Sequence, residues 1–228
     1  MQFTSYNTPL EPGNFYHIYN RGNNYQDTFL APEDYPVFLN KWREFIHPVA
    51  KTFAYNLLPN HFHMLVQIRE EATHVDLPSP EGRLAKSVTG EEEDRQYPVK
   101  EKTPAKPDTG SRITKAFKNF FISYARTAQN KHGFHGAVFH SPFKRKLVGD
   151  NFYFDNLMAY IHYNAQKHGV FKGQLDEYPY SSYRSLISNA PTLLERNFVL
   201  DYFGGIDRFI AYHESLVDSY DLGDDLEP

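Results

Sequence analysis

Residues 52–68 read TFAYNLLPNHFHMLVQI, and this stretch decides the fold. The runs Thr52 to Leu58 and His61 to Ile68 are rich in residues that favour β-strands, and Pro59-Asn60 between them is typical of a tight turn. Two such runs joined by a tight turn predict an antiparallel β-hairpin. The segments on either side of the hairpin then determine which sheet it joins.

The predicted strand from His61 to Ile68 has two chemically different faces, because side chains alternate across a strand. One face holds Phe62, Met64, Val66 and Ile68, and the other holds His61, His63, Leu65 and Gln67. The two imidazoles are roughly 6.5–7 Å apart at their Cα atoms, from where two ring nitrogens can converge on one metal ion. Two ligands are too few, so a third must come from elsewhere in the fold. A pair of polar residues on a half-exposed strand is the alternative interpretation.

Strand and helix patterns continue on both sides of the hairpin. They comprise a strand at 15–19, a helix that opens near residue 31 and ends before Pro48, a helix at 111–132, a strand at 143–148 and a helix at 150–168. The order strand, helix, strand, strand, helix, strand is that of the ferredoxin-like split βαβ plan. We therefore expect an α+β fold with an RRM-like antiparallel four-stranded sheet. The extra helix after the fourth strand is expected to cover the sheet's other face.

The length of 228 residues fits one large domain, or one domain with a substantial appendage. We expect a domain over residues 1–185. Within it, residues 69–110 are expected to form a flexible acidic insertion, because they are rich in Glu and Pro and poor in large apolar residues. Residues 186–228 are expected to form a helical extension with an acidic tail.

The chain contains no Cys, which excludes disulfides, thiol nucleophiles and zinc fingers and fits a reducing compartment. The sequence shows no signal peptide and no apolar run of the length that spans a membrane. We therefore expect a cytoplasmic protein with no membrane partner.

The formal net charge of −4 argues at first against a nucleic-acid partner. The charge is unevenly distributed, however. Residues 111–172 hold ten basic and two acidic residues, a net +8, whereas residues 173–228 hold three basic and eleven acidic residues, a net −8. A basic segment interleaved with Phe, Tyr and His suits a phosphate backbone and stacked bases. A solvated helix face is an equally good interpretation of the charge alone.

Tyr160 and Asn164 lie one turn apart in the helix at 150–168 and therefore share a face. Leu157, Met158 and Ile161 form a neighbouring apolar stripe that can dock this helix on the sheet. A phenol and an amide on a helix above the two histidines would supply a nucleophile and a third ligand. The pair also fits a core aromatic residue and an Asn near a helix end.

Two other tyrosines compete with Tyr160 for the role of nucleophile. Four positions after Tyr124 stands Ala128, which cannot bind a metal, and four positions after Tyr163 stands Lys167, which would repel a cation. Tyr160 is therefore the preferred candidate.

Three motifs together resemble those of a known enzyme family. They are Tyr19-Asn20-Arg21-Gly22, Leu58-Pro59-Asn60-His61-Phe62-His63, and Tyr160-Ile161-His162-Tyr163-Asn164 with the following Lys167-His168-Gly169. In this order and spacing they resemble the single-tyrosine HUH transposases, and within them the REP-associated tyrosine transposases. The resemblance spans about residues 13–185.

The resemblance implies an enzyme that nicks and rejoins single-stranded DNA beside a hairpin through a 5′-phosphotyrosine intermediate. Carried over by position, Tyr160 is the nucleophile on the catalytic helix, and His61, His63 and Asn164 bind a divalent metal, Mg²⁺ or Mn²⁺. The partner would be single-stranded DNA with a hairpin, bound by a monomer or a homodimer.

Basic residues are the candidates for contacts with DNA phosphates. They are Arg21, Arg112, Lys115, Lys118, Lys144, Arg145, Lys146 and Lys167. Two alternatives to the transposase stay open. One is a protein on the same fold that binds DNA or RNA hairpins without cutting them. The other is a replication initiator or relaxase with similar chemistry.

Overall fold

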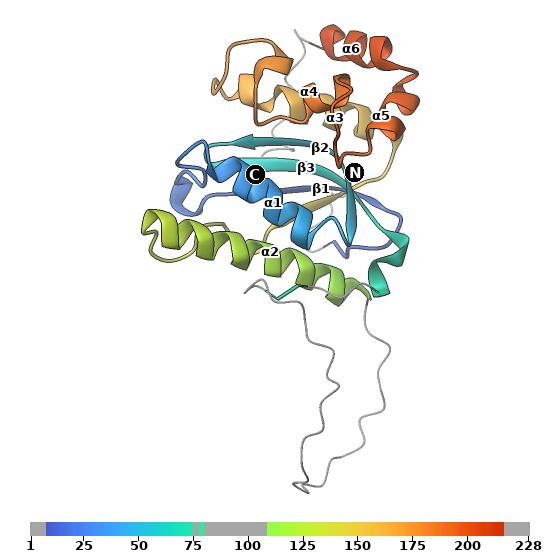
Figure 1. The fold of residues 1–228 in the computed structure, drawn as a ribbon. Helices are drawn as coiled ribbons and strands as arrows, with labels where there is room; N and C mark the ends of the chain where they lie inside the picture. The colour runs from blue at the N-terminus through green and yellow to red at the C-terminus, as the bar shows by residue number, and fades with distance from the viewer. Residues whose placement is uncertain (1–7, 75–77, 80–108, 217–228) are drawn as a thin grey trace, which may run out of the picture.

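The computed structural model describes residues 8–74, 78–79 and 109–216. Its four strands form one antiparallel sheet in the order β2-β3-β1-β4 (Figure 1). The strands are β1 Phe15–Arg21, β2 Ala50–Leu58, β3 His61–Ile68 and β4 Lys144–Val148. This strand order and the order of the elements along the chain are those of the split βαβ plan. The α+β prediction is confirmed.

Two helices cover one face of the sheet, α1 Asp34–Phe45 and α2 Thr109–His132 (Figure 1). The apolar residues of β3 that alternate with the histidines face these helices, since Phe62 packs against Phe38 of α1 and Phe121 of α2. Gly133 follows α2 with φ +69°, a left-handed conformation that ends helices. The predicted alternation in β3 is therefore confirmed on its apolar side.

The other face is covered by α3, Asn151–Lys167, whose N-terminus is capped by the Asp150 side chain accepting from the Tyr153 N–H at 2.7 Å. The predicted stripe Leu157, Met158 and Ile161 is fully buried in a core shared with Phe53 and Leu65. The remaining helices form the outer part of this layer in Figure 1: α4 Tyr183–Ile187, α5 Arg196–Phe203 and α6 Ile206–Ser215. The sheet is thus sandwiched between two helical layers.

Short 3-10 helices occupy Asn23–Tyr25, Glu70–His74 and Leu175–Glu177. The second lies at the start of the expected insertion, and most of that insertion, residues 75–77 and 80–108, lies outside the described residues together with the tail at 217–228. The expected boundary after residue 185 falls inside α4, and Leu186, Val199 and Phe209 share the core of α3. The division at 185 stays a prediction.

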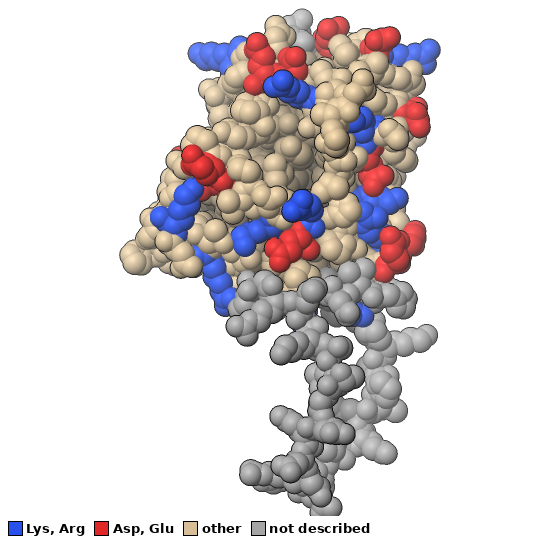
Figure 2. Space-filling view, viewed as in Figure 1, with Lys and Arg blue, Asp and Glu red and all other residues tan. Residues whose placement is uncertain are grey.

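On the face seen in Figure 2, basic and acidic side chains are interspersed around a largely uncharged centre. None of the described helices combines the length and apolar character needed to cross a membrane.

Candidate active site

The sheet face beneath α3 presents a row of polar side chains, one from each strand. The pairing register places Tyr19 of β1 opposite both His63 of β3 and Lys144 of β4, and places His63 opposite Asn56 of β2. Residues that are partners in an antiparallel register project to the same face. Lys144, Tyr19, His63 and Asn56 therefore cross the whole sheet under the helix that holds Tyr160.

His63 lies at the centre of this row and is fully buried. Its Nδ1 is 2.8 Å from Nε2 of His17, a residue of β1 that also stacks on Tyr19 with ring centroids 4.4 Å apart. Burial, followed by the neighbouring histidines, lowers the pKa of His63 well below its usual 6.5. His63 is therefore neutral, and its Nε2 has no hydrogen-bond partner among the described residues.

His61 connects the hairpin to α3. Its Nδ1 is 2.6 Å from Oδ1 of Asn60, and its Nε2 is 2.9 Å from Oδ1 of Asn164. A neutral imidazole has only one N–H, so it cannot donate to both amide oxygens. In the neutral form with Nδ1 donating to Asn60, the lone pair on Nε2 faces the lone pairs of the Asn164 oxygen. Rotation of the Asn164 amide relieves the repulsion between these lone pairs, and so does a cation bound by both His61 Nε2 and Asn164 Oδ1.

Tyr160 projects from α3 onto the histidines. Its ring meets His63 edge-to-face at a centroid distance of 5.3 Å and lies 6.3 Å from the ring of His17. The Lys167 ammonium, at the end of the same helix, sits 5.1 Å from the centre of the Tyr160 ring. Tyr160 is 2% exposed, so a substrate reaches its oxygen only after neighbouring groups move.

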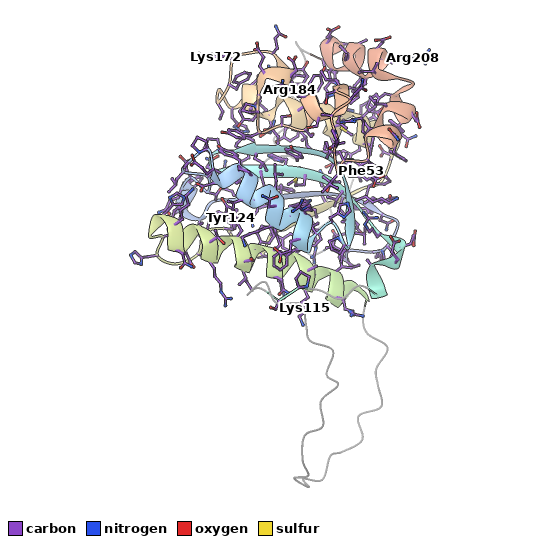
Figure 3. All side chains as sticks on the ribbon, in the orientation of Figure 1. Phe53, Lys115, Tyr124, Lys172, Arg184 and Arg208 are labelled. Carbon is purple, nitrogen blue, oxygen red and sulfur yellow. The ribbon has the colours of Figure 1, made fainter. Side chains whose placement is uncertain are left out.

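The two competing tyrosines lie elsewhere. Tyr124 belongs to α2 on the opposite side of the sheet (Figure 3), where its hydroxyl donates to the Thr28 carbonyl at 2.9 Å. Tyr163 reaches the outer helices, where it donates to the carbonyl of His213 in α6 at 2.8 Å. Of Tyr124, Tyr160 and Tyr163, Tyr160 is the one whose ring meets His63.

Asn56 fastens α3 to the sheet at this point. Its buried Nδ2 donates to the carbonyls of Ile161 at 2.7 Å and His162 at 3.2 Å. The two acceptor carbonyls belong to residues between Tyr160 and Asn164 along the chain. The height and rotation of α3 above the histidines are thus fixed by a strand residue.

The donor set fits a divalent cation. His61 Nε2 and Asn164 Oδ1 are 2.9 Å apart, close to the separation of about 3 Å between adjacent ligands at 2.0–2.1 Å in octahedral geometry. The partnerless His63 Nε2 supplies a third lone pair if its Nδ1 donates to His17. In the described part of the chain no three His, Cys, Asp or Glu side chains group into a metal site, so the set depends on the Asn164 amide.

The predicted DNA-binding cations divide between the two sides of the sheet. Arg21, Lys144 and Lys146 are register partners of His61, Tyr19 and His17 and share their face, and Lys167 lies at the end of α3. Arg145 points to the opposite face, where its guanidinium reaches Thr114 of α2 at 3.5 Å. Arg112, Lys115 and Lys118 lie on α2 itself, and Figure 3 shows Lys115 at the far side of the sheet from α3. The basic segment therefore does not surround Tyr160 as one patch.

Sequence reasoning missed His17, Tyr19 and His168 as members of the site. His168, just after α3, meets His61 edge-to-face at 4.8 Å. For His17 and Tyr19 a signal was present, because Phe15 to Tyr19 alternates in the same way as the histidine strand, with Tyr16 and Ile18 on the apolar side. His162 of the same motif lies outside the site, since its ring nitrogens contact His213 and Ser182.

A scan of protein-family models and a search of curated protein sequences give no match for this chain. Among solved structures, a REP-associated tyrosine transposase bound to a REP hairpin is similar, with a TM-score of 0.49 and 15% sequence identity. The alignment covers 84% of this chain and 94% of that chain. Similarity at this level adds nothing to what the residues of this chain support on their own.

Proposed function

We propose that this chain is a metal-dependent enzyme that nicks and rejoins single-stranded DNA beside a hairpin, with Tyr160 as nucleophile. The observation that supports it most strongly is the convergence of two elements about a hundred residues apart: His61 and His63 of β3 meet Tyr160 and Asn164 of α3. A protein that only binds nucleic acid has no need of this set. The motifs that resemble the single-tyrosine HUH transposases, and the REP-associated branch in particular, contain the same four residues.

The proposed reaction exchanges one phosphoester for another. The Tyr160 oxygen attacks a backbone phosphorus, a tyrosine–phosphorus bond forms, and the bond to the 3′-oxygen breaks. The phenol proton is lost to solvent or a neighbouring base, and the departing 3′-oxygen takes up a proton. The products are a 5′-phosphotyrosine and a free 3′-OH, so attack by a second 3′-OH reverses the step and joins strands without ATP.

The residues around Tyr160 have separate roles in this proposal. The Lys167 ammonium stabilises negative charge as it develops on the phenol oxygen. Lys144 and Lys146, on the same sheet face, bind phosphates of the incoming strand. His61, His63 and Asn164 would hold Mg²⁺ or Mn²⁺, which when bound polarises the non-bridging phosphate oxygens and offsets the charge of the transition state.

The test is a covalent-adduct assay. The protein is incubated with labelled single-stranded DNA hairpins and Mn²⁺, and a denaturing gel is examined for a DNA–protein band. We expect a band that disappears with Tyr160→Phe and with EDTA and persists with Tyr163→Phe, the matched change one turn away on α3. A band that survives Tyr160→Phe and is lost in Tyr124→Phe would contradict the choice of nucleophile.

A second candidate function is a hairpin-binding protein that does not cut, and the burial of Tyr160 favours it. It predicts hairpin binding in a gel-shift assay with no adduct under any metal. In that case Tyr160→Phe leaves affinity unchanged, and the buried histidines serve only the packing of α3.

A further inference from the structure

A pocket of about 490 Å³ opens on the side of the sheet that faces away from Tyr160. It lies between α2 and the segment 137–143, and its volume is within the range of about 300–1,000 Å³ that is usual for small-molecule sites. The site around Tyr160 shares none of its lining residues. The pocket is thus separate from the proposed chemistry.

Three aromatic rings form one wall of the pocket. Phe121 of α2 lies 5.2 Å from Phe139 and 5.3 Å from Phe143, measured between ring centroids. The wall is held in place by backbone bonds to the end of β1, because the His140 N–H donates to the Arg21 carbonyl at 2.9 Å. The Asn20 amide adds a bond of 3.0 Å to the His140 carbonyl. The Phe139 ring stands at 73° to Phe121 and the Phe143 ring at 33°, so a planar ring system can meet the faces or edges of these rings. A pre-formed wall costs little ordering on binding.

Two cations line the same pocket, Arg145 and Lys118. No ion pair between described residues includes either of them, and Arg145 Nε is buried with no hydrogen-bond partner in the described part of the chain. The Arg145 guanidinium stacks near Phe143, with its Cζ 5.2 Å from the ring centre. A half-buried guanidinium without a carboxylate is best satisfied by an anion, and phosphate matches its fork of donors.

We propose that this pocket binds one nucleotide, with its base against the aromatic wall and its phosphate on Arg145 and Lys118. A role of this pocket in DNA processing rests on the proposed function above. Along β4, Lys144 and Lys146 face the Tyr160 side and Arg145 faces the pocket, so a strand that crosses this sheet edge contacts both. The nucleotide is either an unstacked residue of such a strand or a free nucleoside monophosphate.

Free nucleotides test the pocket independently of any cutting activity. Binding of dAMP, dGMP, dCMP, dTMP and inorganic phosphate is measured by equilibrium dialysis on the full chain. We expect at least one nucleotide to bind more tightly than phosphate alone. Arg145→Gln is expected to weaken it about tenfold or more, because a charge-assisted bond is lost. Lys118→Gln acts in the same direction, and Lys172→Gln on the opposite layer is the charge-matched control (Figure 3).

A nucleotide within a strand is tested by anisotropy with a labelled hairpin oligonucleotide that has an abasic site at each position in turn. We expect one position where loss of the base weakens binding, and Ala125→Trp, which fills the pocket, should remove that sensitivity. Circular dichroism checks that Ala125→Trp is folded. If it is not, Arg145→Gln is used in its place to test the same loss of sensitivity to the abasic position. Nucleotide binding with no Tyr160 adduct would refute the proposed function and leave the pocket standing.

The proposal is overturned if no free nucleotide binds more tightly than phosphate and no abasic position weakens binding of the hairpin. It is also overturned if binding is equal in the wild type, Arg145→Gln and Lys118→Gln. If a Tyr160 adduct forms under either of these results, the proposed enzyme activity is supported and the nucleotide pocket is refuted.

Discussion

At the scale of single residues, His17 is the hydrogen-bond partner on which the tautomer of His63 depends. In the 2.8 Å contact between His17 Nε2 and His63 Nδ1, donation from His63 Nδ1 leaves the lone pair of His63 on Nε2, the atom proposed to bind the metal. We predict that His17→Phe, which keeps a ring to stack on Tyr19, lowers Mn²⁺ affinity by about 10–100-fold, as is usual when the partner of a metal-bound imidazole is removed. Isothermal titration with Mn²⁺ measures it.

The control for His17 is His135→Phe, the same exchange at an exposed position in the segment after α2. It should leave Mn²⁺ affinity unchanged. If His17→Phe also binds Mn²⁺ like the wild type, the contact with His63 has no part in metal binding.

The residues of the site differ in how far the sequence could predict them. Alternation within β3 placed His61 and His63 on one face, and the helical repeat placed Tyr160 and Asn164 on one face, because each pattern depends on local backbone geometry alone. The 2.9 Å contact between His61 and Asn164 joins residues about a hundred positions apart, so the local repeat of a strand or a helix cannot predict it. His17 follows the same local alternation in β1, which is sufficient to predict the face on which it lies.

At the scale of elements, the placement of α3 depends on Asn56 of β2. Its amide donates to two helix carbonyls in a fully buried position. We predict that Asn56→Asp lowers the free energy of unfolding by about 3 kcal/mol, because it places a carboxylate against two carbonyl oxygens without a donor. Urea denaturation measures the loss. Asn197→Asp, the same change at an exposed site on α5, should cost far less.

Asn56→Ala separates positioning from charge. It should cost about 1–3 kcal/mol and reduce the yield of Tyr160 adduct beyond the fraction of protein that is unfolded. An adduct yield that follows the folded fraction alone would show that α3 holds its place without this residue.

Which face of the sheet each helix covers was predicted only in part. The split βαβ order gives the sheet and places the two connecting helices on one face. The pattern of charges along α2 contains no information about the side on which Tyr160 lies. Arg112, Lys115 and Lys118 were therefore grouped with Lys144 and Lys146, whereas the fold puts the sheet between the two groups.

At the scale of the whole molecule, the outer helices are joined to α3 through buried neutral histidines. His213 of α6 donates from Nδ1 to the Phe209 carbonyl at 2.8 Å and faces His162, Tyr163 and Tyr183. Burial lowers the pKa of His213 from 6.5 to about 4. Below pH 6.5 the unfolded chain therefore binds a proton that the folded chain excludes, so stability falls as pH decreases from 6.5 to about 4.

The size of this effect follows from the shift in pKa, and it is about 3 kcal/mol over that window for His213. We predict that His213→Gln gives a shallower loss of stability between pH 7.5 and 5.0, by about 2 kcal/mol. Urea midpoints at the two pH values measure it for both proteins. Equal slopes for His213→Gln and the wild type would contradict the assignment of a buried neutral His213.

Because the sheet separates the basic residues into two groups, we can predict how the affinity for single-stranded DNA depends on salt. Arg21, Lys144, Lys146 and Lys167 lie on the side of Tyr160, so single-stranded DNA bound there releases about one cation at each of four phosphate contacts. The logarithm of the binding constant should fall with the logarithm of salt concentration with a slope of about −3 or steeper. Lys144→Gln should reduce the slope by about 0.7, whereas Lys115→Gln on α2 should leave it unchanged. Anisotropy titrations over a range of NaCl concentrations measure both, and an equal change for the two variants would mean that the strand also follows α2.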